Sequence, residues 1–146
     1  MGVNAGLYVI PARKFATAQQ KVSWDRYRWN KCRPWFDIDK AWSQFDDVLK
    51  GRSDALRYVI KGDVRIARNE PGFNFVSPPV VGQITRELAA IPITEVFAAI
   101  ERTSGRTWTA AQRKVEQGYY ERFYEELCKA YQEAAAQGAA LGVLLC

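Results

Sequence analysis

The chain has 146 residues, of which 48% are hydrophobic and 25% are charged, and its formal net charge is +5. This length and balance predict one globular domain spanning residues 1–146 and argue against a disordered chain. Histidine is absent, which excludes serine–histidine and cysteine–histidine nucleophilic mechanisms and removes the commonest metal ligand of proteins.

The first predicted element is a strand in "VNAGLYVIP", a β-branched and aromatic run bounded by Gly2 and Pro11. The opening residues lack the charged stretch and long apolar run of an export signal. The apolar run that ends the chain is far shorter than the roughly 20 residues of a membrane span. We therefore expect a soluble, cytoplasmic protein with no membrane partner.

Residues 21–36, "KVSWDRYRWNKCRPWF", concentrate charge and aromatic rings. They hold five basic residues, one acidic residue and three of the chain's five tryptophans, for a net charge of +4. Trp, Tyr and Arg are enriched where proteins bind proteins, while basic groups between aromatic rings also suit single-stranded nucleic acid. A third interpretation places Trp35 and Phe36 in the core and leaves the charges as a solvated rim. The candidate partner-binding residues are Trp24, Arg26, Tyr27, Arg28, Trp29, Lys31 and Arg33.

The stretch "FDIDKAWSQFDDVLKG", residues 36–51, is predicted as an amphipathic helix. The apolar residues recur at the spacing of one helix face, namely Ile38, Ala41, Trp42, Phe45, Val48 and Leu49. The opposite, solvated face is expected to hold Lys40, Ser43, Gln44, Asp46, Asp47 and Lys50. Asp37 or Asp39 is suited to cap the first turn, and Gly51 is suited to end the helix in the left-handed conformation.

Two shorter elements follow this helix. Ser53 is suited to cap a short helix in "DALRYVIK", which Gly62 ends. The β-branched and aromatic character of "GFNFV" predicts a strand over Phe73–Val76.

Prolines mark the next two helices. Ser77 is suited to cap a helix with Pro78 at its first position, and that helix ends at the next proline. Thr94 is expected to open the following helix, with Ile93 as a hydrophobic staple outside it and an end near Gly105.

The longest helix is predicted from Thr109 to Gly138. Thr109 and Gln112 have the spacing of a capping box, and at about 1.5 Å per residue the helix spans ~40 Å. Its apolar face is expected to contain Val115, Tyr119, Tyr120, Phe123, Tyr124, Leu127, Cys128, Tyr131 and Ala135. Its tyrosines are expected to pack in the core with their hydroxyls reaching water, and the alternative is that they form a partner surface. The apolar run "AALGVLLC" then predicts a buried terminal strand.

These elements predict an α+β fold, a mostly helical single domain with a small sheet formed by the N- and C-terminal strands and a long C-terminal helix. The segments "MGVNAGLYVI", "DIDKAWSQFDDVLKG", "FNFVSPPVVGQITREL" and "YYERFYEELCKAYQEAAAQGAALGVLLC" together resemble the YfbM-like family, small bacterial proteins classed as a domain of unknown function. The resemblance implies the same α+β fold and brings no established reaction, cofactor or catalytic residue. One departure is a helix start of Ser77, Pro78, Pro79 and Val80, where the family usually has Thr-Pro-Glu-Glu.

No catalytic, metal-binding or cofactor-binding residue is predicted. Capping is the commoner role for Asp37 and Asp39, and Glu125 and Glu126, as neighbours on a helix, point in different directions. No phosphate-binding glycine pattern is present. The cysteines show no CxxC spacing and are expected to be reduced thiols, at Cys32, Cys128 and Cys146.

The sequence therefore predicts a non-catalytic domain that binds a protein, in its more specific form an immunity or inhibitor protein that neutralises a bacterial toxin. One alternative is an accessory protein that binds single-stranded nucleic acid. The second alternative is an enzyme that works without histidine, through Asp, Glu and Arg.

Overall fold

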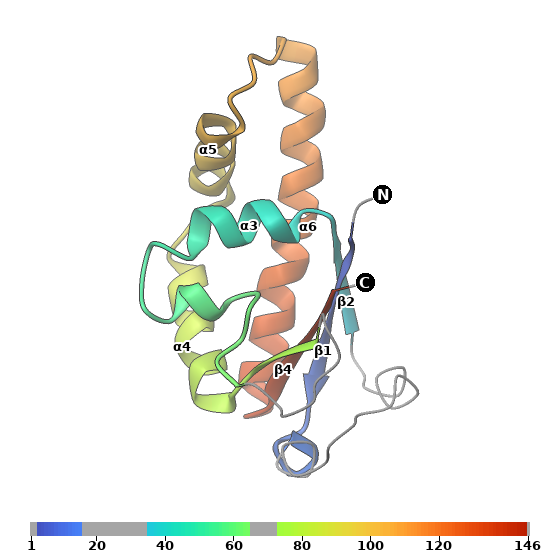
Figure 1. The fold of residues 1–146 in the computed structure, drawn as a ribbon, viewed down its shortest axis with the longest axis vertical. Coiled ribbons are helices and arrows are strands. Elements are labelled where there is room, and N and C mark those ends of the chain that lie inside the picture. Colours follow the sequence, from blue (N-terminus) through green and yellow to red (C-terminus); the bar gives the residue numbers. More distant parts are fainter. Residues whose placement is uncertain (1–2, 16–34, 65–72, 146) are drawn as a thin grey trace.

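The computed structural model describes residues 3–15, 35–64 and 73–145. In these residues four antiparallel strands form a sheet in the order β2-β1-β4-β3, comprising β1 (Ala5–Ile10), β2 (Trp35–Asp39), β3 (Phe73–Val76) and β4 (Ala140–Leu145). The helix α6 (Ala110–Ala136) crosses one face of this sheet, with α3 (Trp42–Leu49), α4 (Pro78–Ala89) and α5 (Ile93–Ser104) packed beside it (Figure 1). The predicted α+β fold is confirmed.

The two terminal strands pair with each other in the middle of the sheet. Their register runs from Ala5 opposite Leu145 to Ile10 opposite Ala140. Along β1, alternate residues face the main core, while Tyr8 and Ile10 face a smaller cluster on the other side of the sheet. Both faces of these strands therefore meet apolar side chains, which agrees with the continuous apolar run at the end of the chain.

The helix predicted from residue 36 is wrong in its first turn. Residues 35–39 form the edge strand β2, and α3 begins only at Trp42, with Ala41 at its N-cap and no side-chain cap. The two patterns overlap because Phe36 and Ile38 alternate as strand residues while Ile38 also fits the helical stripe. Gly51 does not end the helix either, since the chain leaves it at Lys50 in right-handed conformation.

The short helix predicted after α3 is only a short 3-10 turn, although the capping role of Ser53 is confirmed. The hydroxyl of Ser53 accepts a hydrogen bond of 3.1 Å from the N–H of Leu56, the first residue of the 3-10 turn η1 (Leu56–Tyr58). Gly62 lies at φ 73°, and a Cβ atom there would collide with the backbone of Phe75. Glycine is therefore required at this position by both conformation and space.

The starts of α4 and α5 differ in detail from the prediction. Ser77 occupies the N-cap of α4, but its hydroxyl and its N–H donate to the carboxylate of Asp63, at 2.5 and 2.7 Å, so that its side chain does not cap the helix. The helix α5 starts at Ile93 with Pro92 at its N-cap, which places Ile93 inside the helix. Its end at Gly105, at φ 66°, is confirmed.

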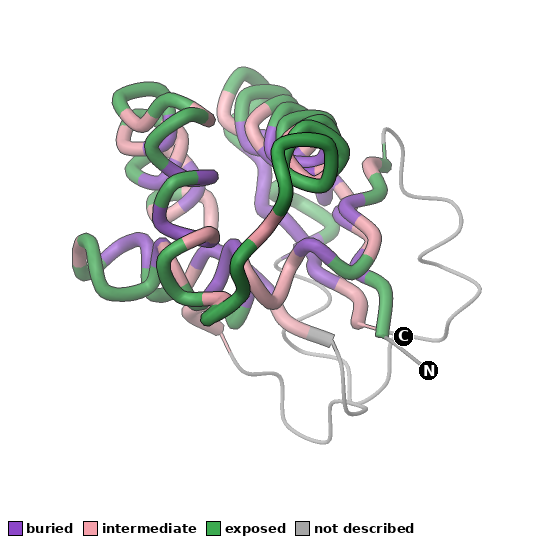
Figure 2. Tube along the Cα trace, turned by 90° about the horizontal axis from the view of Figure 1, so that it is seen from above, coloured by how far each residue is buried: buried purple, intermediate pink, exposed green. Residues whose placement is uncertain are grey.

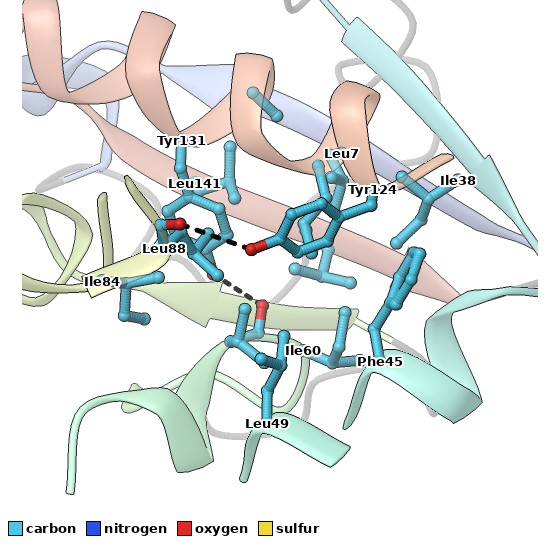
Figure 3. Packing of buried hydrophobic residues seen from close by; sticks show 14 of the residues in the cluster. Leu7, Ile38, Phe45, Leu49, Ile60, Ile84, Leu88, Tyr124, Tyr131 and Leu141 are labelled. Carbon is cyan, nitrogen blue, oxygen red and sulfur yellow. Dashed lines mark hydrogen bonds between the residues drawn. The ribbon is translucent and has the colours of Figure 1, made fainter. Parts of the chain in front are cut away.

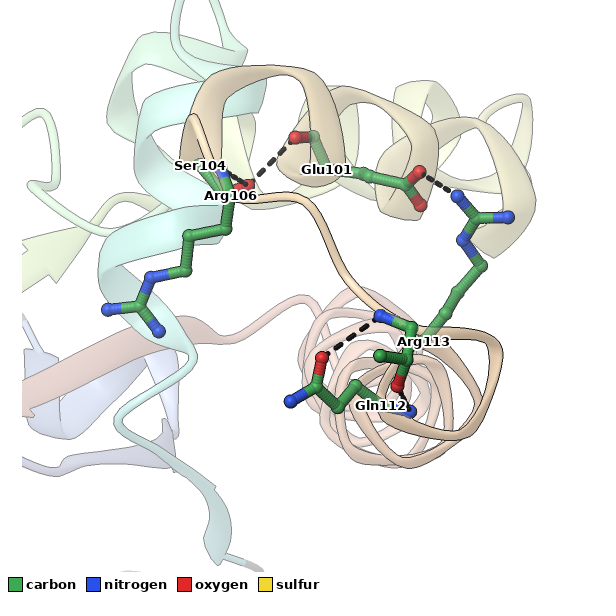
Figure 4. Close-up of polar contacts among 6 residues, drawn as sticks. Glu101, Ser104, Arg106, Gln112 and Arg113 are labelled. Atoms are coloured by element: carbon green, nitrogen blue, oxygen red, sulfur yellow. Dashed lines mark hydrogen bonds and ion pairs between the residues drawn. The ribbon is translucent and has the colours of Figure 1, made fainter.

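The capping box of α6 is confirmed in both directions. The Thr109 hydroxyl accepts from the N–H of Gln112 at 3.1 Å, and the Gln112 side chain accepts from the N–H of Thr109 at 2.9 Å (Figure 4). The helix is followed by Gly138 at φ 60°, as expected of a helix stop. Val115 was expected on the apolar face, yet it is 71% exposed because the first third of α6 extends beyond the sheet (Figures 1 and 2).

Two tyrosines of α6 cross the main core and reach backbone carbonyls. Tyr131 donates to the carbonyl of Val59 at 2.6 Å, and Tyr124 donates to that of Ile91 at 2.7 Å. Figure 3 shows both rings among the aliphatic side chains of the sheet and of α4. The expectation that these hydroxyls reach water is wrong, because the carbonyls at the ends of η1 and α4 face inward and need a donor.

Candidate partner-binding cleft

The partner-binding residues predicted from sequence lie outside the described part of the chain. They are Trp24, Arg26, Tyr27, Arg28, Trp29, Lys31 and Arg33, within residues 16–34. The chain enters the described fold two residues after Arg33, at Trp35, the first residue of β2. The described part of the candidate site therefore begins at Trp35.

Trp35 lies on the surface, with 47% of its area exposed. It pairs with Tyr8 across β1 and β2, and the two rings stack with centroids 6.3 Å apart and planes 26° from parallel. Its place in the core, one of the interpretations of the sequence, is wrong because strand alternation turns it to the side of β2 opposite to the core-facing Phe36 and Ile38. Phe36, the next residue, is half-buried and packs against the main core.

A cleft of about 340 Å³ lies between the edge strand β2 and the middle of α6. On α6, positions i, i+1 and i+4 face the sheet edge together, because the helix turns once in about 3.6 residues. The cleft is lined by Trp35, Phe36, Asp37, Asp39, Arg122, Phe123 and Glu126.

Asp39 is the most constrained residue of this cleft. Its backbone is left-handed, at φ 47°, a region that aspartate tolerates better than most residues. Its N–H donates to the carboxylate of Asp37 at 2.8 Å, and its own carboxylate accepts a hydrogen bond of 2.9 Å from Tyr119 of α6. These contacts fix the carboxylate of Asp39 at the point where β2 ends.

The hydroxyl of Tyr119 is the hydrogen-bond donor to that carboxylate. Burial raises the pKa of Tyr119 well above its ordinary value, and the hydrogen bond to Asp39 and the negative charge of Asp39 raise it further. The hydroxyl therefore keeps its proton at neutral pH. The Tyr119 ring also meets Phe123 edge-on, with centroids 4.9 Å apart, so that the donor is held by packing as well.

The remaining α6 residues add charge of both signs to the cleft. The guanidinium of Arg122 lies over the Phe123 ring, 5.2 Å from its centroid. Glu126 lies 3.9 Å from Lys129 in the next turn, at the outer limit of an ion pair. Among the described residues, the lining thus holds three carboxylates, one guanidinium and three aromatic side chains, a composition suited to polar contacts and ring stacking.

A buried carboxylate lies outside the cleft, on α3. Asp46 was expected on the solvated face, but it is 6% exposed and one of its oxygens has no hydrogen-bond partner among the described residues. Burial raises its pKa, while the charges of Lys61 and Lys50 lower it and that of Asp47 raises it. Lys61 also lies over the Trp42 ring, at 5.3 Å.

Within residues 3–15, 35–64 and 73–145, no group of three Cys, Asp or Glu side chains is arranged to hold a metal ion. Over the same residues, every helix is too short or too polar to cross a membrane.

Sequence reasoning missed the part of the cleft that α6 contributes. Arg122 and Glu126 are four residues apart, next to Phe123, and this spacing places them on one face of the helix. The neighbouring sequence does not indicate that β2 lies opposite this face. The pairing of Tyr119 with Asp39 joins residues 80 positions apart. The sequence signal for this side of the cleft was that the tyrosines of the last helix spread over more than one helix face.

The comparisons with known proteins agree with this fold. The profile of a family described as a domain of unknown function, DUF1877, matches residues 16–144. The crystal structure of a protein of unknown function, YfbM from Escherichia coli, superposes with a TM-score of 0.70 over 98% of this chain and 99% of that chain, at 17% sequence identity. No curated protein gives a match. The resemblance seen in the sequence is confirmed.

Proposed function

Because the chain belongs to the DUF1877 family of unknown function, we propose from its own residues that it is a protein-binding domain. The observation that carries the proposal is the exposed Trp35 beside the β2–α6 cleft. Tryptophan is among the residues most enriched at binding hot spots, and a cleft beside it offers the pocket that such anchors use. We place the centre of the partner surface there.

In its more specific form the proposal is an inhibitor or immunity protein that neutralises a bacterial toxin in the cytoplasm. The proposal includes the residues that precede Trp35 in the sequence and have the composition of a protein-binding segment, namely Trp24, Arg26, Tyr27, Arg28, Trp29, Lys31 and Arg33. The lack of histidine supports a role that needs no general base.

Protein is favoured over nucleic acid by the charge of the cleft. Three of its lining residues are acidic, and carboxylates repel a phosphate backbone. The nucleic-acid alternative predicts binding to RNA or single-stranded DNA that weakens steeply with salt. Binding of that kind with no protein partner would replace the present proposal.

The test is co-purification of the tagged full chain with the products of the genes that neighbour its own. The wild-type chain is compared with Trp35→Ala and with the double variant Arg28→Glu/Trp29→Ala, and each affinity is measured by calorimetry. We expect a neighbouring product to bind, and each variant to weaken binding by about tenfold or more.

The matched control is Val115→Ala. Val115 is also an exposed apolar residue, but it lies near the free end of α6, and its replacement should leave the affinity unchanged. If no neighbouring product binds, or if Trp35→Ala binds as tightly as wild type, the proposed surface is wrong. Protection of cells from a toxic neighbouring product tests the inhibitor form directly.

A further inference from the structure

The buried carboxyl group of Asp46 on α3 lacks the partner that its burial demands. Asp46 is 6% exposed, and one of its carboxylate oxygens has no hydrogen-bond partner among the described residues. Buried polar atoms of native proteins are nearly always paired, and an ionised carboxylate without a partner costs far more to bury than the neutral acid. The surroundings of Asp46 are therefore those of a carboxylic acid that holds its proton.

Lys61 is the cation that acts most strongly on this acid. Burial raises the pKa of Asp46, and Lys61 opposes that shift more than Lys50 does, while Asp47 adds to it. Within the described residues, however, the ammonium of Lys61 forms no ion pair with Asp46. It lies instead over the ring of Trp42, 5.3 Å from the ring centroid.

Trp42 and Asp46 are neighbours on α3, since residues four apart lie side by side on one face of a helix. The ring of Trp42 is fixed, because it packs against the main core and its Nε1–H donates to the carbonyl of Val3 at 2.7 Å. Lys61 is exposed and carries its charge on a flexible four-carbon stem. Its ammonium can therefore move from the ring to the acid while both of these stay in place.

The charged groups of the elements packed against α3 do not compete for Asp46. These elements are α5 and the turn η1. Their charged residues are paired elsewhere or exposed: Glu95 pairs with Arg52, Glu101 with Arg113, Arg57 donates to Tyr58, and Arg102 is exposed. On α3 itself, Asp47 and Lys50 pair with each other at 3.5 Å. Lys61 is thus the cation available to the acid.

We propose that Asp46, Lys61 and Trp42 form a proton-controlled latch: Lys61 rests on the Trp42 ring while Asp46 is protonated, and pairs with the carboxylate once Asp46 has released its proton to water. The physical reason is that an uncompensated buried charge costs more than an exposed cation–π contact contributes. The pairing offsets part of that cost. It also ties α3 to the chain between η1 and β3, so that this connection is held more firmly at neutral pH than in acid.

The experiment is an NMR titration of the full chain from about pH 4 to pH 8, a range that covers a raised carboxyl pKa. The carboxyl carbon of Asp46 reports its protonation, and the ε-methylene protons of Lys61 report the ring, whose current shifts nuclei above it upfield. We expect the Lys61 protons to be shifted upfield in acid and to return toward their ordinary position with the same midpoint as Asp46. Lys61 signals that stay constant while Asp46 titrates, or that move with another midpoint, overturn the latch.

Three variants separate the latch from a general effect of pH. Asp46→Asn has the shape of the protonated acid, so Lys61 should stay on the ring at every pH. Lys61→Gln removes the attracting charge and should move the titration of Asp46 to higher pH. Asp47→Asn is the matched control, an exposed carboxylate next in sequence, and should keep the movement of Lys61.

The two informative variants test the latch independently. A Lys61 movement that persists in Asp46→Asn, or an Asp46 midpoint that is unchanged in Lys61→Gln, contradicts the proposal. The wild-type titration and Lys61→Gln decide the question even if Asp46→Asn does not fold. The latch lies apart from the proposed partner surface, and its test requires no partner.

Discussion

The two parts of α6 are held in place by different forces. Residues 120–134 carry every buried side chain of the helix, namely Tyr120, Phe123, Tyr124, Leu127, Ala130, Tyr131 and Ala134. Residues 110–118 carry none and depend on local contacts. These are the capping box and an ion pair of 2.6 Å between Arg113 and Glu101 (Figure 4), and, just before the helix, the stacking of Trp108 on Phe97. One continuous helix thus combines a core element with a surface element.

The strongest test of this contrast is truncation of an aliphatic side chain in each part. Leu127 is fully buried, so Leu127→Ala should lower the free energy of unfolding by about 2–5 kcal/mol, through lost burial and the cavity it leaves. Val115→Ala, at an exposed position, should change it by less than about 0.5 kcal/mol. Urea denaturation followed by circular dichroism measures both. Equal losses would mean that the first part of α6 is packed as tightly as the second.

The hydroxyls of Tyr131 and Tyr119 should also differ in their contribution to the free energy of unfolding. Tyr131→Phe removes the donor to the buried carbonyl of Val59, which is then unpaired, and the cost should be about 1–3 kcal/mol. Tyr119→Phe removes a donor to the half-buried Asp39, where water can replace it, and should cost less. The same denaturation experiment gives both values. A smaller loss for Tyr131→Phe than for Tyr119→Phe would contradict the burial argument.

Much of the fold could be predicted because its signals are local. The capping box at Thr109, the helix stops at Gly105 and Gly138 and the apolar terminal strands each depend on neighbouring residues or on one periodicity. The edge strand β2 was missed because Ile38, one of its two inward residues, also fits a helical stripe. Asp46 was misplaced because helical period alone cannot show that a second element covers a polar position.

The candidate site was harder to predict for the same reason. The cleft exists only because β2 and α6 lie side by side, and its acidic residues come from segments far apart in sequence. The composition of residues 21–36 indicated one side of the cleft, because this segment ends with Trp35 and Phe36, which line it. The residues opposite, such as Arg122, carry no local signal that separates them from an ordinary solvated helix face.

The contrast between buried and exposed positions recurs on α3, where two adjacent aspartates differ. Asp46 is buried, whereas the side chain of Asp47 is 61% exposed beside Lys50. Asp46→Asn removes a buried charge and should raise the free energy of unfolding at pH 7 by about 1 kcal/mol. Asp47→Asn is the control and should have almost no effect.

The effect of Asp46 depends on pH in a defined direction. Its pKa in the folded chain is raised above the ordinary value of 3.8, so folding favours the protonated form. The stabilising contribution of that form is fully present below pH 3.8 and is lost as pH rises through the raised pKa. The advantage of Asp46→Asn over wild type should therefore shrink as the solution is acidified. An advantage that is constant with pH would show that folding leaves the pKa of Asp46 unchanged. A loss of stability at pH 7 would show that attraction to Lys61 outweighs the cost of burial.

The smallest expected effect lies at the exposed start of α6. Thr109→Ala removes both the hydroxyl acceptor and the order it gives to Gln112, which should cost about 0.5–1 kcal/mol. Because residues 110–118 are held by local contacts, the loss should appear as faster hydrogen exchange of the amides in the first turn, while those of residues 120–134 keep their protection. Thr107→Ala, an exposed threonine outside the helix, is the control. If protection fell equally along the whole helix, α6 would unfold as one unit, and the division between its two parts would describe burial without describing stability.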